Sequence, residues 1–301
     1  MRSEEGHHDR TDYARRIVDR VEDRIPFGGD SQVDDRNVII TPMNPMLTDP
    51  FLLLSEDWFS TAGFEWHPHR GLETVTLVLD GVLEHGDSLG NAGALTAGDI
   101  QWMTAGRGII HRELAFRNER AHTLQLWVNL PGELKMVDTR YQDLRAAARP
   151  VIERAGVRID LISGAVDGAS GPALNNWPIR GTIITLEPNR SHEHMLPGHD
   201  RVFFYVLSGE LIVGGRVVRA GQVAWSDPLP RAAGSRITVA TGDGDQPSVV
   251  MVYSGQPIRQ PVVMGGPFVM NTNAEIIQAF MDFQTGKFGD IPRQGRLEYH
   301  G

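Results

Sequence analysis

TVTLVLDGVLEH at residues 74–85 and VFFYVLSGELIV at residues 202–213 are the two segments from which the fold can be predicted. Each has an apolar run rich in β-branched or aromatic residues, a turn that contains glycine, and a second apolar run. This pattern is typical of two antiparallel strands joined by a tight turn. A second pair agrees, because TAGDIQWM at 96–103 is matched by RAGQVAWS at 219–226. The internal repeat favours two similar β-barrels.

The rest of the chain fits this division. Short apolar runs alternate with glycine and aspartate turns over residues 37–130, as in an antiparallel sandwich or barrel, and a looser connector follows at 131–150. We therefore expect one domain at 1–145 and another at 146–301. Residues 273–283 have the apolar spacing of a short helix, and residues 13–24 are also predicted to be helical.

Composition excludes several classes of function. The 301 residues leave room for two domains of about 150 residues each. A net charge of −9 without a run of Lys or Arg argues against direct nucleic-acid binding. The apolar stretch FLLL at 51–54 is too short to cross a membrane, and the charged first thirty residues lack a signal-peptide core, so we expect a cytoplasmic protein. The absence of cysteine excludes disulfides, thiolate ligands and thiol redox chemistry.

Two short motifs carry metal-binding chemistry: HPH at 67–69 and HRE at 111–113. Alternate residues of a strand point to the same face, so the outer two residues of each motif project together. If the two strands are neighbours, three imidazoles and one carboxylate converge. One such motif arises easily by chance among eleven histidines, but two in a β context are more specific. The predicted ligands are His67, His69, His111 and Glu113.

This ligand set suits several metals. Imidazole and carboxylate together bind Fe(II), Ni, Mn, Cu or Zn, and we expect one divalent transition metal, with Fe(II) as the first choice. Four protein ligands on a metal that accepts five or six leave positions for water, substrate or O₂.

The motif-bearing region resembles the pirin family. The resemblance includes HPHRGLETVTLVLDG at 67–81, HGDSLGN at 85–91 and LTAGDIQWMTAGRGIIHRE at 95–113. It continues through LQLWVNLP at 124–131 and RYQ at 140–142, and it resumes with GPFVMNT at 266–272. The resemblance implies an all-β fold of two cupin (jelly-roll) barrels packed together, with a metal on the four predicted ligands of the first barrel.

The resemblance also implies a function. Pirins are similar to quercetin 2,3-dioxygenases, which open the flavonol ring with O₂ and release carbon monoxide. Glu113 would then be the catalytic residue that takes the 3-hydroxyl proton. The expected partners are a small flavonol-like aromatic substrate and O₂, and the candidate wall residues of the substrate pocket are Phe64, Trp66 and Met103. The alternative is a regulatory metal-binding protein that modulates a transcription factor or a metabolic enzyme, with a protein partner.

Some positions depart from the family pattern or duplicate its motif. Trp66 and Arg112 stand where the family has smaller residues, which bears on the shape of the pocket. Glu73 occupies the carboxylate position of the general cupin motif, but we favour Glu113 as the ligand and Glu73 as a supporting or strand-face residue. A second HxH motif, SHEH at 191–194, has no histidine in its downstream complement. We interpret it as a polar loop and expect no metal in the second barrel.

Overall fold

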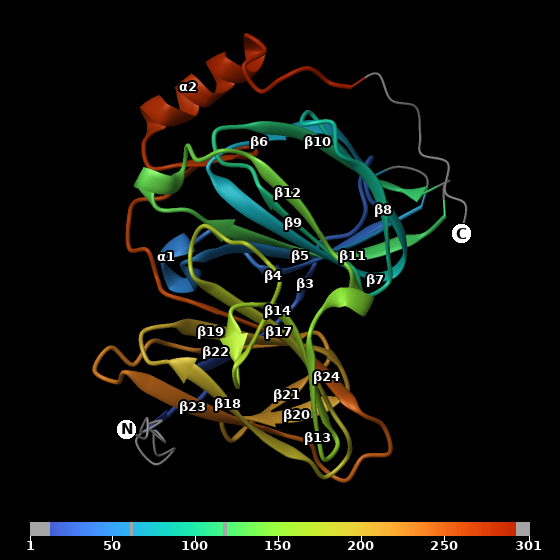
Figure 1. Cartoon of the computed structure of the whole chain (residues 1–301), viewed down its shortest axis with the longest axis vertical. Helices are drawn as coiled ribbons and strands as arrows, with labels where there is room; N and C mark the ends of the chain where they lie inside the picture. The colour runs from blue at the N-terminus through green and yellow to red at the C-terminus, as the bar shows by residue number, and fades with distance from the viewer. Residues whose placement is uncertain (1–12, 61–62, 117–118, 293–301) are drawn as a thin grey trace, which may run out of the picture.

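The computed structural model describes residues 13–60, 63–116 and 119–292. Its secondary structure is mostly β, and two barrels lie one above the other along the long axis of the molecule (Figure 1). The expected all-β architecture of two packed barrels with a short C-terminal helix is confirmed. No helix within these described residues is long and apolar enough to span a membrane.

The N-terminal barrel is one antiparallel sheet organised around the long strand β7. The first half of β7 pairs with β9 and β11, and its second half pairs with β8 and β10. Because β7 contributes to both sides, the sheet curls round into a barrel. Its strands are β3 (Ile25–Pro26), β4 (Asp35–Ile40), β5 (Phe51–Phe59), β6 (Gly63–His69), β7 (Leu72–Asp87), β8 (Ala92–Thr96), β9 (Ile100–Thr104), β10 (Ile109–Ala115), β11 (Ala121–Asn129) and β12 (Arg140–Leu144).

The C-terminal barrel repeats this plan with two facing sheets. One sheet contains β2 (Arg20–Asp23), β13 (Val151–Arg154), β14 (Val157–Ser163), β17 (Ile179–Leu186), β19 (Arg201–Ser208), β22 (Gln222–Ser226) and β24 (Ser248–Gly255). The other contains β1 (Ala14–Arg15), β18 (Ser191–Pro197), β20 (Glu210–Val213), β21 (Arg216–Arg219) and β23 (Gly234–Ala240). Outside the barrels are the hairpins β15 (Ala165–Val166) with β16 (Ala169–Ser170) and β25 (Val263–Gly265) with β26 (Phe268–Met270), and the helices α1 (Pro45–Thr48) and α2 (Asn273–Gln284).

The two predicted helices had different outcomes. The helix predicted at 273–283 is confirmed as α2. The helix predicted at 13–24 is wrong, because this segment forms β1 and β2. Both strands join the C-terminal barrel, where β1 pairs with β23 and β2 pairs with β22. Long-range pairing with an existing sheet therefore overrides the local helical pattern.

A shared apolar core joins the two barrels. Val75 and Leu77 on one face of β7 pack in the same buried cluster as Phe203 of β19. The rings of Phe51 and Phe203 meet edge to face with centroids 4.9 Å apart. Since both sheets bury apolar faces in this cluster, the hydrophobic effect holds the barrels together.

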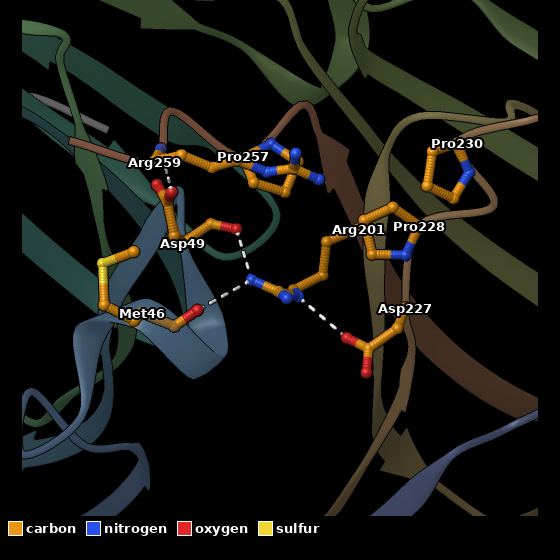
Figure 2. Close-up of a pocket in the computed structure, with 8 residues that line it drawn as sticks. All are labelled: Met46, Asp49, Arg201, Asp227, Pro228, Pro230, Pro257 and Arg259. Carbon is orange, nitrogen blue, oxygen red and sulfur yellow. Dashed lines mark hydrogen bonds and ion pairs between the residues drawn. The ribbon is translucent and has the colours of Figure 1, made fainter.

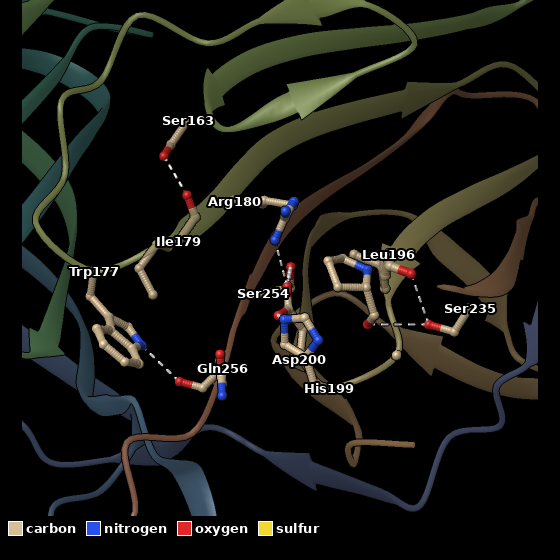
Figure 3. A network of polar contacts seen from close by, with 12 residues as sticks. Ser163, Trp177, Ile179, Arg180, Leu196, His199, Asp200, Ser235, Ser254 and Gln256 are labelled. Atoms are coloured by element: carbon tan, nitrogen blue, oxygen red, sulfur yellow. Dashed lines mark hydrogen bonds and ion pairs between the residues drawn. The ribbon is translucent and has the colours of Figure 1, made fainter. Parts of the chain in front are cut away.

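Polar contacts fix the C-terminal barrel near this interface (Figure 3). Arg180 Nη1 lies 2.9 Å from Asp200 Oδ2, and the Ser254 hydroxyl donates to the same carboxylate at 2.9 Å. Nearby, Trp177 Nε1 donates to the Gln256 carbonyl at 2.8 Å. These bonds tie β17 to β24 and to the turn before β19, so they support the fold of this barrel.

A pocket of about 430 Å³ lies at the junction between α1 and the C-terminal barrel (Figure 2). Arg201 crosses it, donating from Nη1 to the Asp49 carbonyl at 2.8 Å and from Nε to Asp227 Oδ1 at 3.0 Å. The Met46 carbonyl is a further acceptor of Arg201. The Arg201 guanidinium therefore holds α1 against the C-terminal barrel.

Candidate metal centre

The candidate site is built where β6 and β10 run antiparallel in the N-terminal barrel. His67 on β6 lies directly opposite His111 on β10, and His69 is two residues farther along β6. The ring centroids of His67 and His111 are 4.3 Å apart, and both are 5.0 Å from that of His69. One nitrogen from each ring can be chosen so that all three lie within 4.8 Å of one another. The predicted histidines are therefore brought together as the spacing indicated.

Their protonation and surroundings suit a metal. Burial lowers the pKa of His69 to about 3 and lowers the pKa of His111 well below its usual value. The pKa of His67 is also lowered, mainly by burial. All three rings are therefore neutral at pH 7, as metal binding requires. His69 Nε2 and both nitrogens of His111 are buried without a hydrogen-bond partner in the described part of the chain. Unpartnered buried imidazole nitrogens are costly in an apo-protein and are satisfied by a bound metal ion.

Two backbone carbonyls orient the rings. His67 Nδ1 lies 2.7 Å from the Glu65 carbonyl, and His69 Nδ1 lies 3.1 Å from the Pro267 carbonyl. A carbonyl only accepts, so in both rings Nδ1 carries the hydrogen and Nε2 keeps its lone pair. This arrangement leaves Nε2 of both rings free to bind a metal.

Glu113 is buried on the same strand as His111, but amide groups hold its carboxylate. Gln125 Nε2 donates to Oε2 at 2.6 Å, and Gln101 Nε2 and the Thr76 hydroxyl donate to Oε1. Its oxygens are not part of the group of ligand atoms formed by the three histidines. Burial raises the pKa of the Glu113 carboxyl above its usual value.

His111 belongs to the histidine group and Glu113 does not, and a register shift lies between these two residues on β10. The pairing of β10 with β6 slips by one residue after His111, so that Glu113 lies opposite Phe64. The pairing of β10 with β7 stays regular, with Glu113 opposite His85. A bulge of this kind changes the direction in which nearby side chains point.

The three candidate pocket residues have different surroundings. The Phe64 ring lies 6.0 Å from the His67 ring, next to the histidine group. Met103 is fully buried in a small cluster with Ile109 of β10. Trp66 packs instead beneath the guanidinium of Arg112, whose carbon is 5.0 Å from the ring centroid. The two positions that depart from the family pattern therefore contact each other.

Several polar and aromatic residues near the histidines were not predicted as site residues from the sequence. The Trp127 ring is 5.1 Å from the His69 ring, and its Nε1 donates to Gln125. The His85 ring stacks on Tyr141 at 4.1 Å and lies 5.7 Å from the His111 ring. The sequence signal that could have identified Gln125 is a polar residue between apolar neighbours on a strand.

Glu73 lies at the domain interface. Its carboxylate accepts hydrogen bonds from Trp102 Nε1 at 3.1 Å and from the Thr104 hydroxyl at 2.8 Å. Asn176 of the C-terminal domain donates to it from Nδ2 at 2.7 Å. Glu73 therefore binds the two domains together, in agreement with a strand-face position.

The second HxH motif is a strand and not the polar loop that its sequence suggested. His192 and His194 lie on β18, and both side chains are buried. Their partners on β23 are Val239 and Ile237, which offer no ligand atoms. In the N-terminal barrel the equivalent cross-strand neighbour of His67 is another histidine.

Comparisons with known proteins agree with this architecture. The family model Pirin matches residues 32–128, and the model Pirin C-terminal cupin domain matches residues 182–289. The chain belongs to the pirin family. A pirin-like protein of Solanum lycopersicum is 36% identical over 91% of this chain and 93% of its own length. Pirin of Homo sapiens is 38% identical over 80% of this chain and 83% of its own length.

A solved structure extends the comparison to the fold. Quercetin 2,3-dioxygenase from Acinetobacter baumannii superposes with a TM-score of 0.80 at 30% identity, covering 93% of this chain and all of that one. Together with the matched cupin domain, this similarity confirms the two-domain cupin fold implied by the sequence resemblance.

Proposed function

We propose that this pirin is a metal-dependent dioxygenase of the quercetin 2,3-dioxygenase type, which opens the flavonol ring with O₂ and releases carbon monoxide. The main support is the group of three neutral imidazoles, of which His69 and His111 are buried and have ring nitrogens without a hydrogen-bond partner among the described residues. The similarity to the A. baumannii quercetin 2,3-dioxygenase over nearly the whole chain favours this reaction class.

His67, His69 and His111 would hold one divalent transition metal, with Fe(II) as our first choice and Ni, Mn, Cu or Zn as alternatives. When bound, the metal supplies Lewis-acid and template chemistry. We propose Glu113 as the fourth ligand, because it is buried two residues from His111 on the same strand. To ligate, its carboxylate would exchange amide donors such as Gln125 for the metal.

Glu113 is also the proposed catalytic base. A flavonol has an acidic 3-hydroxyl group, and its proton must be accepted before the ring can be attacked. Burial raises the pKa of the Glu113 carboxyl, which makes its carboxylate a stronger base than an exposed glutamate. Once the carboxylate is released from the metal, Gln125 and Gln101 would hold it in place while it accepts the proton.

A flat aromatic substrate would use the apolar surroundings of the histidines. Phe64 and Met103 are retained as candidate wall residues, and Trp127 and Tyr141 join them because their rings contact His69 and His85. Aromatic and apolar walls with a few polar groups are typical of small-molecule sites.

The test is turnover by protein stripped with chelator and reloaded separately with Fe(II), Ni, Mn, Cu or Zn. We expect one metal form to consume O₂, bleach the long-wavelength absorbance of quercetin and release carbon monoxide. His67→Ala should abolish this turnover, whereas His199→Ala, at a half-exposed histidine of the C-terminal barrel, should not. Absence of carbon monoxide with every metal would reject the dioxygenase proposal and favour the regulatory metal-binding protein.

A further inference from the structure

The end of the described chain returns to the N-terminal barrel. We define the C-terminal strap as residues 263–289, which contain β25, β26, α2 and the turn after α2. Figure 1 shows α2 beyond β6 and β10, on the opposite side of the N-terminal barrel from the other domain. Phe268 and Phe288 of the strap pack with Ile110 of β10 in one buried cluster. The strap therefore covers the two strands that carry the three histidines.

The strap contacts one candidate ligand directly. The Pro267 carbonyl accepts the hydrogen bond from His69 Nδ1 at 3.1 Å, although the two residues are 198 positions apart. This bond fixes the tautomer in which His69 Nε2 keeps its lone pair. A backbone carbonyl of the C-terminal strap therefore determines which nitrogen of His69 would bind the metal.

A buried ion pair holds the strap at this point. Arg70 follows His69 directly, and its Nη1 lies 2.9 Å from Asp282 Oδ2 of α2, with side chains 5% and 10% exposed. Arg70 Nε donates to the Arg107 carbonyl at 2.7 Å, and its guanidinium carbon is 4.5 Å from the centroid of the Phe288 ring. These contacts tie the Arg70 guanidinium to the strap and to the loop before β10.

The backbones also approach closely. The Val269 N–H donates to the Arg70 carbonyl at 3.0 Å. Gly71 has φ of +79°, and a side-chain carbon there would lie 2.1 Å from the Val269 carbonyl oxygen. Only glycine allows this approach. Backbone contacts as well as side chains therefore dock the strap against the turn between β6 and β7.

We propose that the C-terminal strap is a positioning element of the metal site, in which Pro267 orients His69 and the Arg70–Asp282 pair keeps Pro267 in place. The inference rests on the metal site of the proposed function. Coupling between two events is reciprocal, so a strap that favours metal binding is itself docked more firmly when metal is bound.

The first experiment measures Ni²⁺ affinity by competition with a chelator in wild type, Asp282→Asn and Asp200→Asn. Asp282→Asn removes the charge that pairs with Arg70 and, within the strap, with Lys287, and it keeps the side-chain size. Asp200→Asn is the matched control, because Asp200 makes an Arg–Asp pair of the same 2.9 Å length in the C-terminal barrel. Loss of groups that orient metal ligands weakens binding about 10- to 100-fold, and we expect this for Asp282→Asn and less than about a twofold change for the control.

The second experiment needs no variant. Hydrogen exchange of wild type is followed with and without Ni²⁺, and the amides of α2 and of residues 267–270 should exchange more slowly in the loaded protein. Amides of β20 and β21 in the C-terminal barrel serve as the internal reference.

The outcomes separate this inference from the proposed function. Equal Ni²⁺ affinity in wild type and Asp282→Asn, or an equal loss in both variants, would overturn the coupling while leaving the metal site intact. Exchange in the strap that is unchanged by bound Ni²⁺ would overturn it as well. A wild-type chain that binds none of the five metals would overturn the metal site and the strap's role with it.

Discussion

At the scale of single residues, Glu113 has two proposed roles, metal ligand and catalytic base, which one substitution can separate. Its carboxylate is buried and receives hydrogen bonds from Gln125, Gln101 and Thr76. These bonds explain how a carboxylate can stay in a closed barrel interior, since a buried charge needs hydrogen-bond partners. They also mean that ligation of a metal competes with the amide donors.

For Glu113→Gln we expect a modest loss of metal affinity and a much larger loss of turnover. The amide cannot accept the 3-hydroxyl proton, and loss of a general base costs about 10²- to 10⁴-fold in rate. The measurement is quercetin turnover at matched metal content, which separates catalysis from metal loading. Rates equal to wild type would leave Glu113 without a catalytic role, as a ligand only.

A second residue-scale prediction concerns His194, which is buried beside Phe204 in the C-terminal barrel. Burial lowers its pKa to about 3 from the usual value of about 6.5. Between these values the unfolded chain binds a proton that the folded chain does not, so stability is lost as pH falls from about 6.5 to 3.

His194→Leu should therefore match or exceed wild-type stability at pH 7 and gain about 2 to 3 kcal/mol over wild type at pH 4.5. Urea unfolding of the metal-free proteins at the two pH values gives the comparison. His199→Leu is the control, because the His199 side chain is half exposed. An equal pH dependence in wild type and His194→Leu would contradict the prediction.

At the scale of elements, α2 begins with a capping box. The Glu275 N–H donates to the Thr272 hydroxyl at 3.2 Å, and the Thr272 N–H donates to the Glu275 carboxylate at 2.8 Å. Thr272→Ala should destabilise α2 by about 0.5 to 2 kcal/mol, because an N–H at the helix start loses its acceptor.

Native-state hydrogen exchange of the α2 amides measures this effect, with rates expected to rise about 2- to 30-fold. Thr285→Ala, at the other end of α2, is the control. Its hydroxyl donates to the Met281 carbonyl, which already accepts the Thr285 N–H, so its loss leaves no backbone group unpaired. Equal exchange rates in the two variants would show that the cap does not limit the opening of α2.

The elements that were predicted correctly have strong local patterns. The helical spacing at 273–283 corresponds to α2. The two strands and tight turn predicted at TVTLVLDGVLEH are wrong, because β7 runs through Gly81 as one strand from Leu72 to Asp87. The matching segment at 202–213 forms β19 and β20, which belong to different sheets and do not pair with each other. The segment at 13–24 was mispredicted because its strands exist only by pairing with β22 and β23, more than 190 residues later. SHEH was mispredicted as a loop because all four of its residues are polar. The alternation of exposed and buried positions that buries His192 and His194 therefore has no matching polar and apolar pattern in the sequence.

The histidine group was predictable because an i, i+2 spacing on a strand determines a shared face. The groups that surround the histidines and Glu113 could not be predicted from the sequence. Gln101 and Gln125 reach Glu113 from two other strands, so only the closed barrel brings them together. Pro267 contacts His69 through a backbone carbonyl, which has no signature in the sequence.

At the scale of the whole molecule, two similar barrels differ in what faces the HxH pair. His67 has His111 opposite, whereas His194 has Ile237 opposite and His192 has Val239. Ile237 and Val239 belong to the apolar core of the C-terminal barrel. The two barrels therefore present the same motif on one strand and different chemistry on the strand that pairs with it.

We accordingly predict one tightly bound metal per chain, in the N-terminal barrel. Two imidazoles without a third ligand bind a divalent ion weakly, because each added protein ligand contributes to affinity. Elemental analysis of protein purified without a metal-affinity tag should give about one equivalent in wild type and close to none in His111→Ala. Circular dichroism should show that His111→Ala stays folded, because each barrel keeps its apolar core and the fold does not depend on metal as a zinc finger does. Retention of one equivalent by His111→Ala would place the metal elsewhere, and two equivalents in wild type would give the C-terminal histidines a site of their own.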